Sequence, residues 1–191
     1  MQKVYIGIYG GTFDPPHEGH LHVATTLMKR LKLGGVWWVV TGRNHLKPEA
    51  MYSFSKRKEL VKNMVSRHAG MRIADIGSSR SYDVVRTCQQ RYPHIKFVWL
   101  CGTDNMATMH MWHRFSDFSA MVPIVFLERP GYMYCVMHKK VASLVPRIPV
   151  VCSEVLCNAR FGWCVIRTKT NTETSTSIRC GLRVENFPSP H

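Results

Sequence analysis

Short apolar runs alternate with stretches of helical spacing along most of this chain. The runs that read as buried strands cover residues 4–9, 36–40, 71–76, 95–101 and 122–127. Strands that are apolar without alternation are typical of parallel sheets covered by helices on both faces. The sequence therefore predicts an α/β fold, built as a single Rossmann-like parallel sheet with helices on both sides.

The helices expected between these strands follow the same order. One carries apolar residues from Leu21 to Leu31, the next two cover about 55–68 and 82–91, and another ends near Phe118. Beyond Pro130 the pattern weakens, with a helix expected over 137–145, a strand over 162–167 and a helix over 175–182. With 191 residues and no repeat or linker, residues 1–191 are expected to form one domain.

The chain is strongly basic, with 26 Lys and Arg against 12 Asp and Glu and a formal net charge of +14. Such a field attracts nucleotides, nucleic acid or acidic membrane surfaces without choosing among them. No apolar run approaches the roughly 20 residues that a membrane helix needs, so no membrane span is expected.

The seven cysteines are scattered, and none forms a Cys-x-x-Cys pair. Several lie inside apolar runs, as Cys101 does. This usage indicates reduced, buried thiols in a cytoplasmic protein, and it argues against a zinc site.

The stretch richest in chemistry follows the first predicted strand and reads Gly-Gly-Thr-Phe-Asp-Pro-Pro-His-Glu-Gly-His over residues 10–20. Its two glycines are expected to let the backbone turn sharply and approach a ligand closely. His17 and His20 stand three residues apart where the next helix begins, so they share one helix face. Free N–H groups at a helix start favour phosphate, and two imidazole donors beside them predict a phosphate site.

This stretch resembles the motif of bacterial nicotinate-nucleotide adenylyltransferases, which belong to the nucleotidyltransferase superfamily with the His-x-Gly-His motif. The resemblance implies the nucleotidyltransferase fold. It also implies transfer of AMP from ATP to nicotinate mononucleotide, giving deamido-NAD and pyrophosphate in NAD biosynthesis. Relatives that adenylylate phosphopantetheine usually carry threonine in place of His17.

Further segments are similar to the same family. The loop after the second strand, residues 41–47, matches except that His45 replaces a proline. Residues 79–83 match except that Arg80 replaces a tyrosine and Ser81 takes the place of a threonine. The resemblance implies that nicotinate mononucleotide is bound by Asn44, Lys47, Ser81, Tyr82, Trp112 and Arg129. Ser81 would lie near the nicotinate carboxylate, and Trp112 would stack on the pyridine ring.

The residues expected to bind ATP lie in the first motif, in the segment after the fourth strand, and in residues 174–179. The resemblance implies that ATP is bound by Gly10, Gly11, Thr12, Phe13, His17, His20, Gly102, Asp104, Thr176, Ser177 and Arg179. Asp104 suits a ribose hydroxyl. Residues 174–191 are expected to form a phosphate-binding helix followed by a shortened tail.

The expected catalytic groups are His17 and His20 on the α-phosphate oxygens, with Lys47 and Arg179 neutralising the departing pyrophosphate. Mg²⁺ is expected to arrive on the ATP phosphates, with no metal site in the protein itself.

Each of these residues also has a purely structural interpretation that involves no ligand. Lys47 could be an ordinary solvated loop lysine, and Trp112 could be a core tryptophan. Ser81 could belong to a turn, and residues 174–176 could form a helix N-cap. At the level of function, the alternatives are nicotinamide mononucleotide or another phosphate as acceptor, and a basic RNA-binding protein on a decayed nucleotidyltransferase fold. A nucleic acid partner is not expected, because basic and aromatic residues do not interleave on one strand. Whether the protein forms a homo-oligomer is left open by the sequence.

Overall fold

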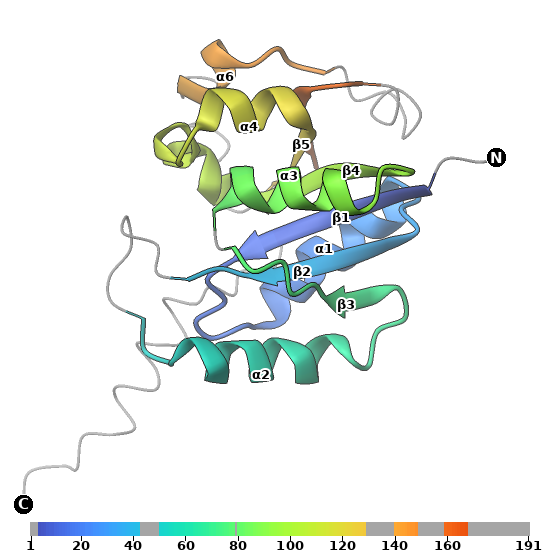
Figure 1. The fold of residues 1–191 in the computed structure, drawn as a ribbon, viewed down its shortest axis with the longest axis vertical. Helices are drawn as coiled ribbons and strands as arrows, with labels where there is room; N and C mark the ends of the chain where they lie inside the picture. Colours follow the sequence, from blue (N-terminus) through green and yellow to red (C-terminus); the bar gives the residue numbers. More distant parts are fainter. Residues whose placement is uncertain (1–3, 43–49, 79, 129–139, 149–158, 168–191) are drawn as a thin grey trace, which may run out of the picture.

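The computed structural model describes residues 4–42, 50–78, 80–128, 140–148 and 159–167. These residues form a six-stranded sheet with the order β3-β2-β1-β4-β5-β6 (Figure 1). The strands are β1 (Val4–Gly11), β2 (Gly35–Val40), β3 (Met71–Ile73), β4 (Ile95–Gly102), β5 (Pro123–Leu127) and β6 (Gly162–Ile166). Every neighbouring pair is parallel, which confirms the predicted α/β fold.

Helices cover both faces of the sheet. The helices are α1 (Glu18–Arg30), α2 (Phe54–Val65), α3 (Ser81–Arg91), α4 (Phe115–Met121) and α6 (Lys140–Leu144), with two 3₁₀ turns, η1 (Thr103–Ala107) and η2 (Met109–Met111). The apolar side chains of α1 and α2 belong to one core cluster, and those of α3, α4 and α6 belong to the other. Accordingly, α1 and α3 lie on opposite sides of the sheet (Figure 1).

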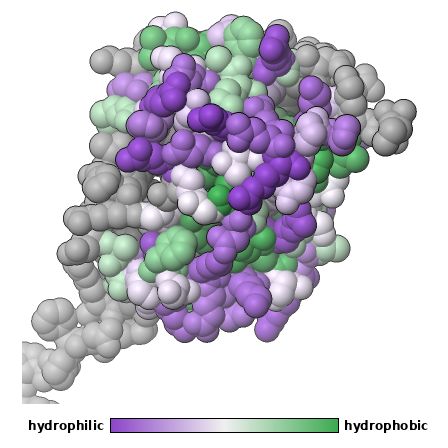
Figure 2. Space-filling view, viewed as in Figure 1, coloured by the Kyte–Doolittle hydropathy of each residue, from purple (hydrophilic) through white to green (hydrophobic). Residues whose placement is uncertain are grey.

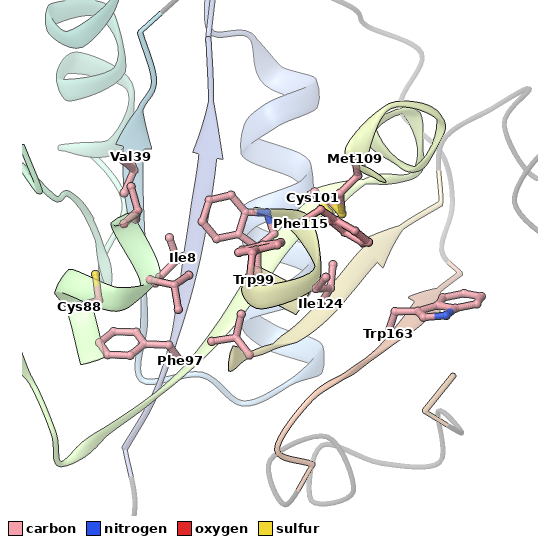
Figure 3. Packing of buried hydrophobic residues seen from close by; sticks show 14 of the residues in the cluster. Ile8, Val39, Cys88, Phe97, Trp99, Cys101, Met109, Phe115, Ile124 and Trp163 are labelled. Carbon is pink, nitrogen blue, oxygen red and sulfur yellow. The ribbon is translucent and has the colours of Figure 1, made fainter. Parts of the chain in front are cut away.

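The central strands are buried on both faces, which explains their unbroken apolar runs. In β2, Trp37 and Val39 pack into the cluster under α3, while Val36, Trp38 and Val40 pack into the cluster under α1 and α2. Figure 3 shows part of the cluster under α3 and α4, where Trp99 of β4 packs against residues of β5 and α4. The outer surface in the view of Figure 2 is mostly hydrophilic, with smaller hydrophobic patches.

Some boundaries differ from the predicted ones. The third strand was expected over 71–76 but ends at Ile73, because it is an edge strand paired only with β2, and the chain turns at Gly77 with a φ of 73°. The helix expected to end near Phe118 is instead two 3₁₀ turns and then α4, which runs to Met121. Arg114 separates them with a φ of 53°, a left-handed conformation that no α-helix continues through.

Toward the C-terminus, the strand expected over 162–167 is present as β6. The helix expected over 137–145 is present over Lys140–Leu144, and the helix expected over 175–182 lies outside the described residues. Within the described ranges, no helix is long and apolar enough to cross a membrane.

The thiols of Cys88, Cys101 and Cys164 are buried and form no disulfide, as the cysteine pattern predicted. Burial raises the pKa of Cys88 to about 11, against the opposing effect of Arg91. Burial likewise raises the pKa of Cys164 to about 12, against the opposing effect of Arg147.

These thiols are therefore expected to resist alkylation, since the thiolate is the reactive form and is scarce in the native protein. Mass spectrometry after iodoacetamide treatment at about pH 8 should find Cys88 and Cys164 unlabelled in the native protein and labelled in guanidinium. Equal labelling in both states would contradict their burial.

Candidate active site

The strand order reverses beside β1. The chain proceeds from β1 to β2 and β3 on one side, and then crosses to β4 on the other side of β1. Ligands of open α/β sheets bind outside the carboxyl ends of the strands at such a switch point. The segments that follow β1 and β4 are the first motif and residues 102–104, so the fold brings together two segments that the resemblance assigned to ATP.

The two histidines of the first motif form a reciprocal cap at the start of α1. His17 is the N-cap, and its Nδ1 accepts a hydrogen bond from the backbone N–H of Gly19 at 3.1 Å. The Nδ1 of His20 accepts from the backbone N–H of His17 at 3.2 Å. The ring centroids are 3.8 Å apart, so the predicted pairing of the two imidazoles is present.

This cap determines where each imidazole carries its proton. A ring nitrogen that accepts a hydrogen bond has no proton, so the neutral rings of His17 and His20 are protonated at Nε2. Nε2 is therefore the donor atom of both rings. Two neighbouring donors at a helix start form an arrangement suited to the oxygens of one phosphate group.

The glycines that precede the histidines serve packing rather than turning. Gly10 and Gly11 are the last residues of β1, and the turn comes later, at Phe13, whose φ is 47°. A Cβ added to Gly10 would lie 2.5 Å from the Trp99 ring, and one added to Gly11 would lie 2.9 Å from the Phe13 ring. The prediction of a sharp turn at the glycines was wrong, because the missing side chains make room for these aromatic rings.

Two buried charged residues, Asp14 and Arg57, hold the loop after β1 through hydrogen bonds to the backbone, and sequence reasoning did not find these contacts. Asp14 and Arg57 are each 3% exposed. The Asp14 carboxylate accepts from the backbone N–H groups of Met51 and Tyr52 at 2.8 and 3.0 Å. Burial lowers the pKa of the Arg57 guanidinium, and the nearby Asp14 partly opposes this. Arg57 lies in a basic helix whose lysines and arginines read as a solvated face, so nothing in the sequence set it apart.

Two of the segments that the resemblance assigned to nicotinate mononucleotide, the start of α3 and the segment around Trp112, meet on the α3 side of the sheet. Ser81 begins α3, and Tyr82 lies under the guanidinium of Arg114, which is 4.1 Å from the ring centroid. Trp112, two residues before Arg114, is partly buried, with ring centroids 6.2 Å from Trp99 and 6.1 Å from the core residue Phe118. The fold thus brings Tyr82 and the Trp112 segment together, and Arg114 is a contact that no sequence signal predicted.

A cavity of about 300 Å³ opens at the carboxyl ends of β2 and β3. It is lined by Val39, Val40, Gly42, Phe54, Lys58, Ile73, Ala74, Asp75, Ile76, Gly77 and Ser78. Lys58 and Asp75 form an ion pair of 2.6 Å in this lining, while the two imidazoles of the first motif are not part of it.

The remaining predicted residues divide between the described and the undescribed parts of the chain. Gly102 ends β4 and is buried, and Asp104 lies in η1 and is half-buried. Asn44, Lys47, Arg129, Thr176, Ser177 and Arg179 lie outside the described residues.

Comparison with known proteins gives the family. The cytidylyltransferase-like family model matches residues 8–180. The probable nicotinate-nucleotide adenylyltransferase of Ruegeria sp. (strain TM1040) is 33% identical over 181 residues, covering 91% of this chain and 95% of the relative. The chain belongs to the nicotinate-nucleotide adenylyltransferase family. The probable family member of Cereibacter sphaeroides (strain ATCC 17025) is 32% identical over 178 residues, covering 91% of this chain and 96% of the relative.

Solved structures agree with this adenylyltransferase fold. The nicotinic acid mononucleotide adenylyltransferase of Plasmodium falciparum, complexed with NaAD, superposes with a TM-score of 0.68 at 17% identity. That match covers 93% of this chain and 83% of the other. The fold predicted from the sequence is therefore confirmed by both topology and structural likeness.

Proposed function

We propose that this adenylyltransferase joins nicotinate mononucleotide to the AMP part of ATP, giving deamido-NAD and pyrophosphate. The observation that carries the proposal is the paired cap of His17 and His20, which makes Nε2 the donor atom of two adjacent rings. The pair stands directly after β1, beside the switch point where nucleotides bind in this class of fold. The names of the relatives in the same family support the same reaction.

The chemistry needs no nucleophilic side chain, because the 5′-phosphate of the acceptor attacks the α-phosphorus of ATP in line and pyrophosphate leaves. Such transfers depend mainly on positioning and on stabilising the charge of the equatorial oxygens. We assign His17 and His20 to the α-phosphate oxygens, with Lys47 and Arg179 neutralising pyrophosphate. Thr12 is assigned as a further hydrogen-bond donor.

The remaining ATP contacts come from both sides of the switch point. On the β1 side they are the Gly10–Phe13 backbone, and on the β4 side they are Gly102 and the Asp104 carboxylate toward the ribose. Thr176 and Ser177 are assigned to the β- and γ-phosphates. Among the described residues, no three His, Cys, Asp or Glu side chains gather into a metal site. We propose that Mg²⁺ arrives with ATP and is held by the triphosphate, whose oxygens are the hard ligands that Mg²⁺ prefers.

The acceptor is proposed to lie between Trp112 and the start of α3. There Ser81 and the N–H groups of the first helical turn are suited to a carboxylate, because the first N–H groups of a helix lack intrahelical partners. Tyr82, Asn44 and Arg129 complete the proposed acceptor contacts.

The acceptor choice is tested by pyrophosphate release with ATP–Mg²⁺ and either nicotinate or nicotinamide mononucleotide. We expect kcat/KM to be about tenfold or more higher with nicotinate mononucleotide, since the amide carries no charge for the helix start to stabilise. A tenfold preference for the amide would overturn the choice. Thermal shift with single-stranded RNA serves as the control, and stabilisation by RNA without stabilisation by nucleotide would favour the RNA-binding alternative.

We also propose a cytoplasmic location. The three cysteines of the described residues are buried and form no disulfide, which suits a reducing compartment.

A further inference from the structure

Arg57 binds main-chain oxygens of three different segments. It stands in the first turns of α2, which begins after the Ser53 N-cap. Its Nη1 donates to the carbonyl of Thr12, in the loop after β1, and to the carbonyl of Thr41, just beyond β2, at 2.9 Å. Its Nε donates to the carbonyl of Tyr52 at 3.2 Å. A guanidinium can serve this arrangement because its donors are held in one rigid plane.

Asp14 makes the matching contacts from the other direction. Its carboxylate belongs to the loop after β1 and accepts from Met51 and Tyr52 in the segment that leads into α2. Arg57 belongs to α2 and reaches back to Thr12. The two buried charges therefore fasten the loop and the start of α2 to each other at several points. Removing the Arg57 charge would remove its electrostatic attraction to Asp14 and its hydrogen bonds to the Thr12, Thr41 and Tyr52 carbonyls.

The loop held in this way leads directly to His20. Phe13 follows Thr12 with a φ of 47°, a conformation that is unfavourable for a bulky residue and persists only when its surroundings hold it. The Phe13 ring is 2% exposed and meets the His20 ring edge-on, with centroids 5.0 Å apart. On another side it packs on Trp38, also at 5.0 Å. The position of the Phe13 ring thus limits where the imidazole of His20 can lie.

We propose that Arg57 is a positioning residue of the transfer reaction. By holding the Thr12 carbonyl, it fixes the Phe13 conformation and, through the Phe13 ring, the orientation of His20. This inference rests on the proposed function, because it gives Arg57 its effect through the donor assigned to the α-phosphate. Small displacements of a donor lower the rate of the bound complex more than they weaken binding of the substrate.

The test compares Arg57→Met with Val61→Ala, a substitution of a fully buried residue one turn further along α2 that weakens core packing but removes none of the hydrogen bonds of Arg57. At a temperature where both variants are folded, we expect Arg57→Met to lower kcat by about tenfold to a hundredfold with a smaller change in the KM for ATP. Val61→Ala should keep kcat within about twofold of the original.

A second measurement does not depend on activity. ¹⁵N spectra of the histidine side chains report the protonated nitrogen and surroundings of His20, assigned by comparison with His20→Asn. Arg57→Met should shift the His20 signals, and Val61→Ala should leave them in place. If the original protein fails to adenylylate nicotinate mononucleotide, the proposed function fails, while these spectra still test the role of Arg57.

Arg57→Lys is a second variant that keeps the proposal testable if Arg57→Met does not fold. It keeps the charge beside Asp14 but lacks the planar set of donors. Its kcat and the chemical shifts of its His20 signals should therefore lie between those of the original protein and of Arg57→Met. The proposal is overturned if the His20 signals stay unchanged in the folded Arg57 variants. It is equally overturned if the kcat of these variants matches that of Val61→Ala.

Discussion

Replacement of His20 by alanine is expected to lower kcat by a factor of several hundred. One preorganised donor at a developing charge is worth about 3–4 kcal/mol of barrier. The substitution also removes the acceptor that caps the backbone N–H of His17, so the second imidazole loses part of its support. Steady-state pyrophosphate release with saturating ATP and nicotinate mononucleotide measures the effect.

The matched control is His94→Ala, which removes an exposed imidazole just before β4, at the amino end of the sheet and away from the proposed site. Its kcat should be unchanged. Circular dichroism should show that both variants are folded. A His20→Ala enzyme with near-normal turnover would remove the role assigned to the paired imidazoles.

Replacement of Phe118 by alanine is expected to be the most destabilising of the substitutions considered. Phe118 is 0% exposed and packs edge-on against Trp99, with ring centroids 5.1 Å apart, under Trp112. Truncating a buried phenylalanine costs about 3–5 kcal/mol of unfolding free energy, through lost burial and the cavity left behind. For a chain of this length that corresponds to a fall in Tm of roughly 6–20 °C.

Thermal or urea unfolding measures this loss, with Phe161→Ala as the control. Phe161 is 46% exposed, so its truncation should change the unfolding free energy by less than about 0.5 kcal/mol. The loss of support under Trp112 should also raise the KM of the Phe118 variant for nicotinate mononucleotide. Equal unfolding free energies for the two variants would contradict the packing of this core.

The central strands β1, β2, β4 and β5 could be predicted because they are buried on both faces, so burial appears in the sequence as an unbroken apolar run. The edge strand β3 was predicted too long because the apolar residues Ala74 and Ile76, which follow its last residue, also pack against the core. The break before α4 was missed because it lies at the left-handed backbone of Arg114, which no residue preference favours.

The site could be predicted in part because the two histidines are close in sequence and share a helix start. The contacts of Arg57 and Arg114 could not be predicted, since their partners lie far along the chain. Arg57 reaches Thr12 across 45 positions, and Arg114 lies over Tyr82 of another helix.

The sequence by itself determined the parallel α/β sheet, the family and the paired imidazoles, because short-range spacing and apolar patterning carry that information. Only the tertiary structure decided that the glycines of the first motif admit aromatic rings, and that a buried Asp14–Arg57 pair holds the loop. Close approach between distant segments depends on how the layers pack. Such packing involves residues whose spacing along the chain has no fixed period.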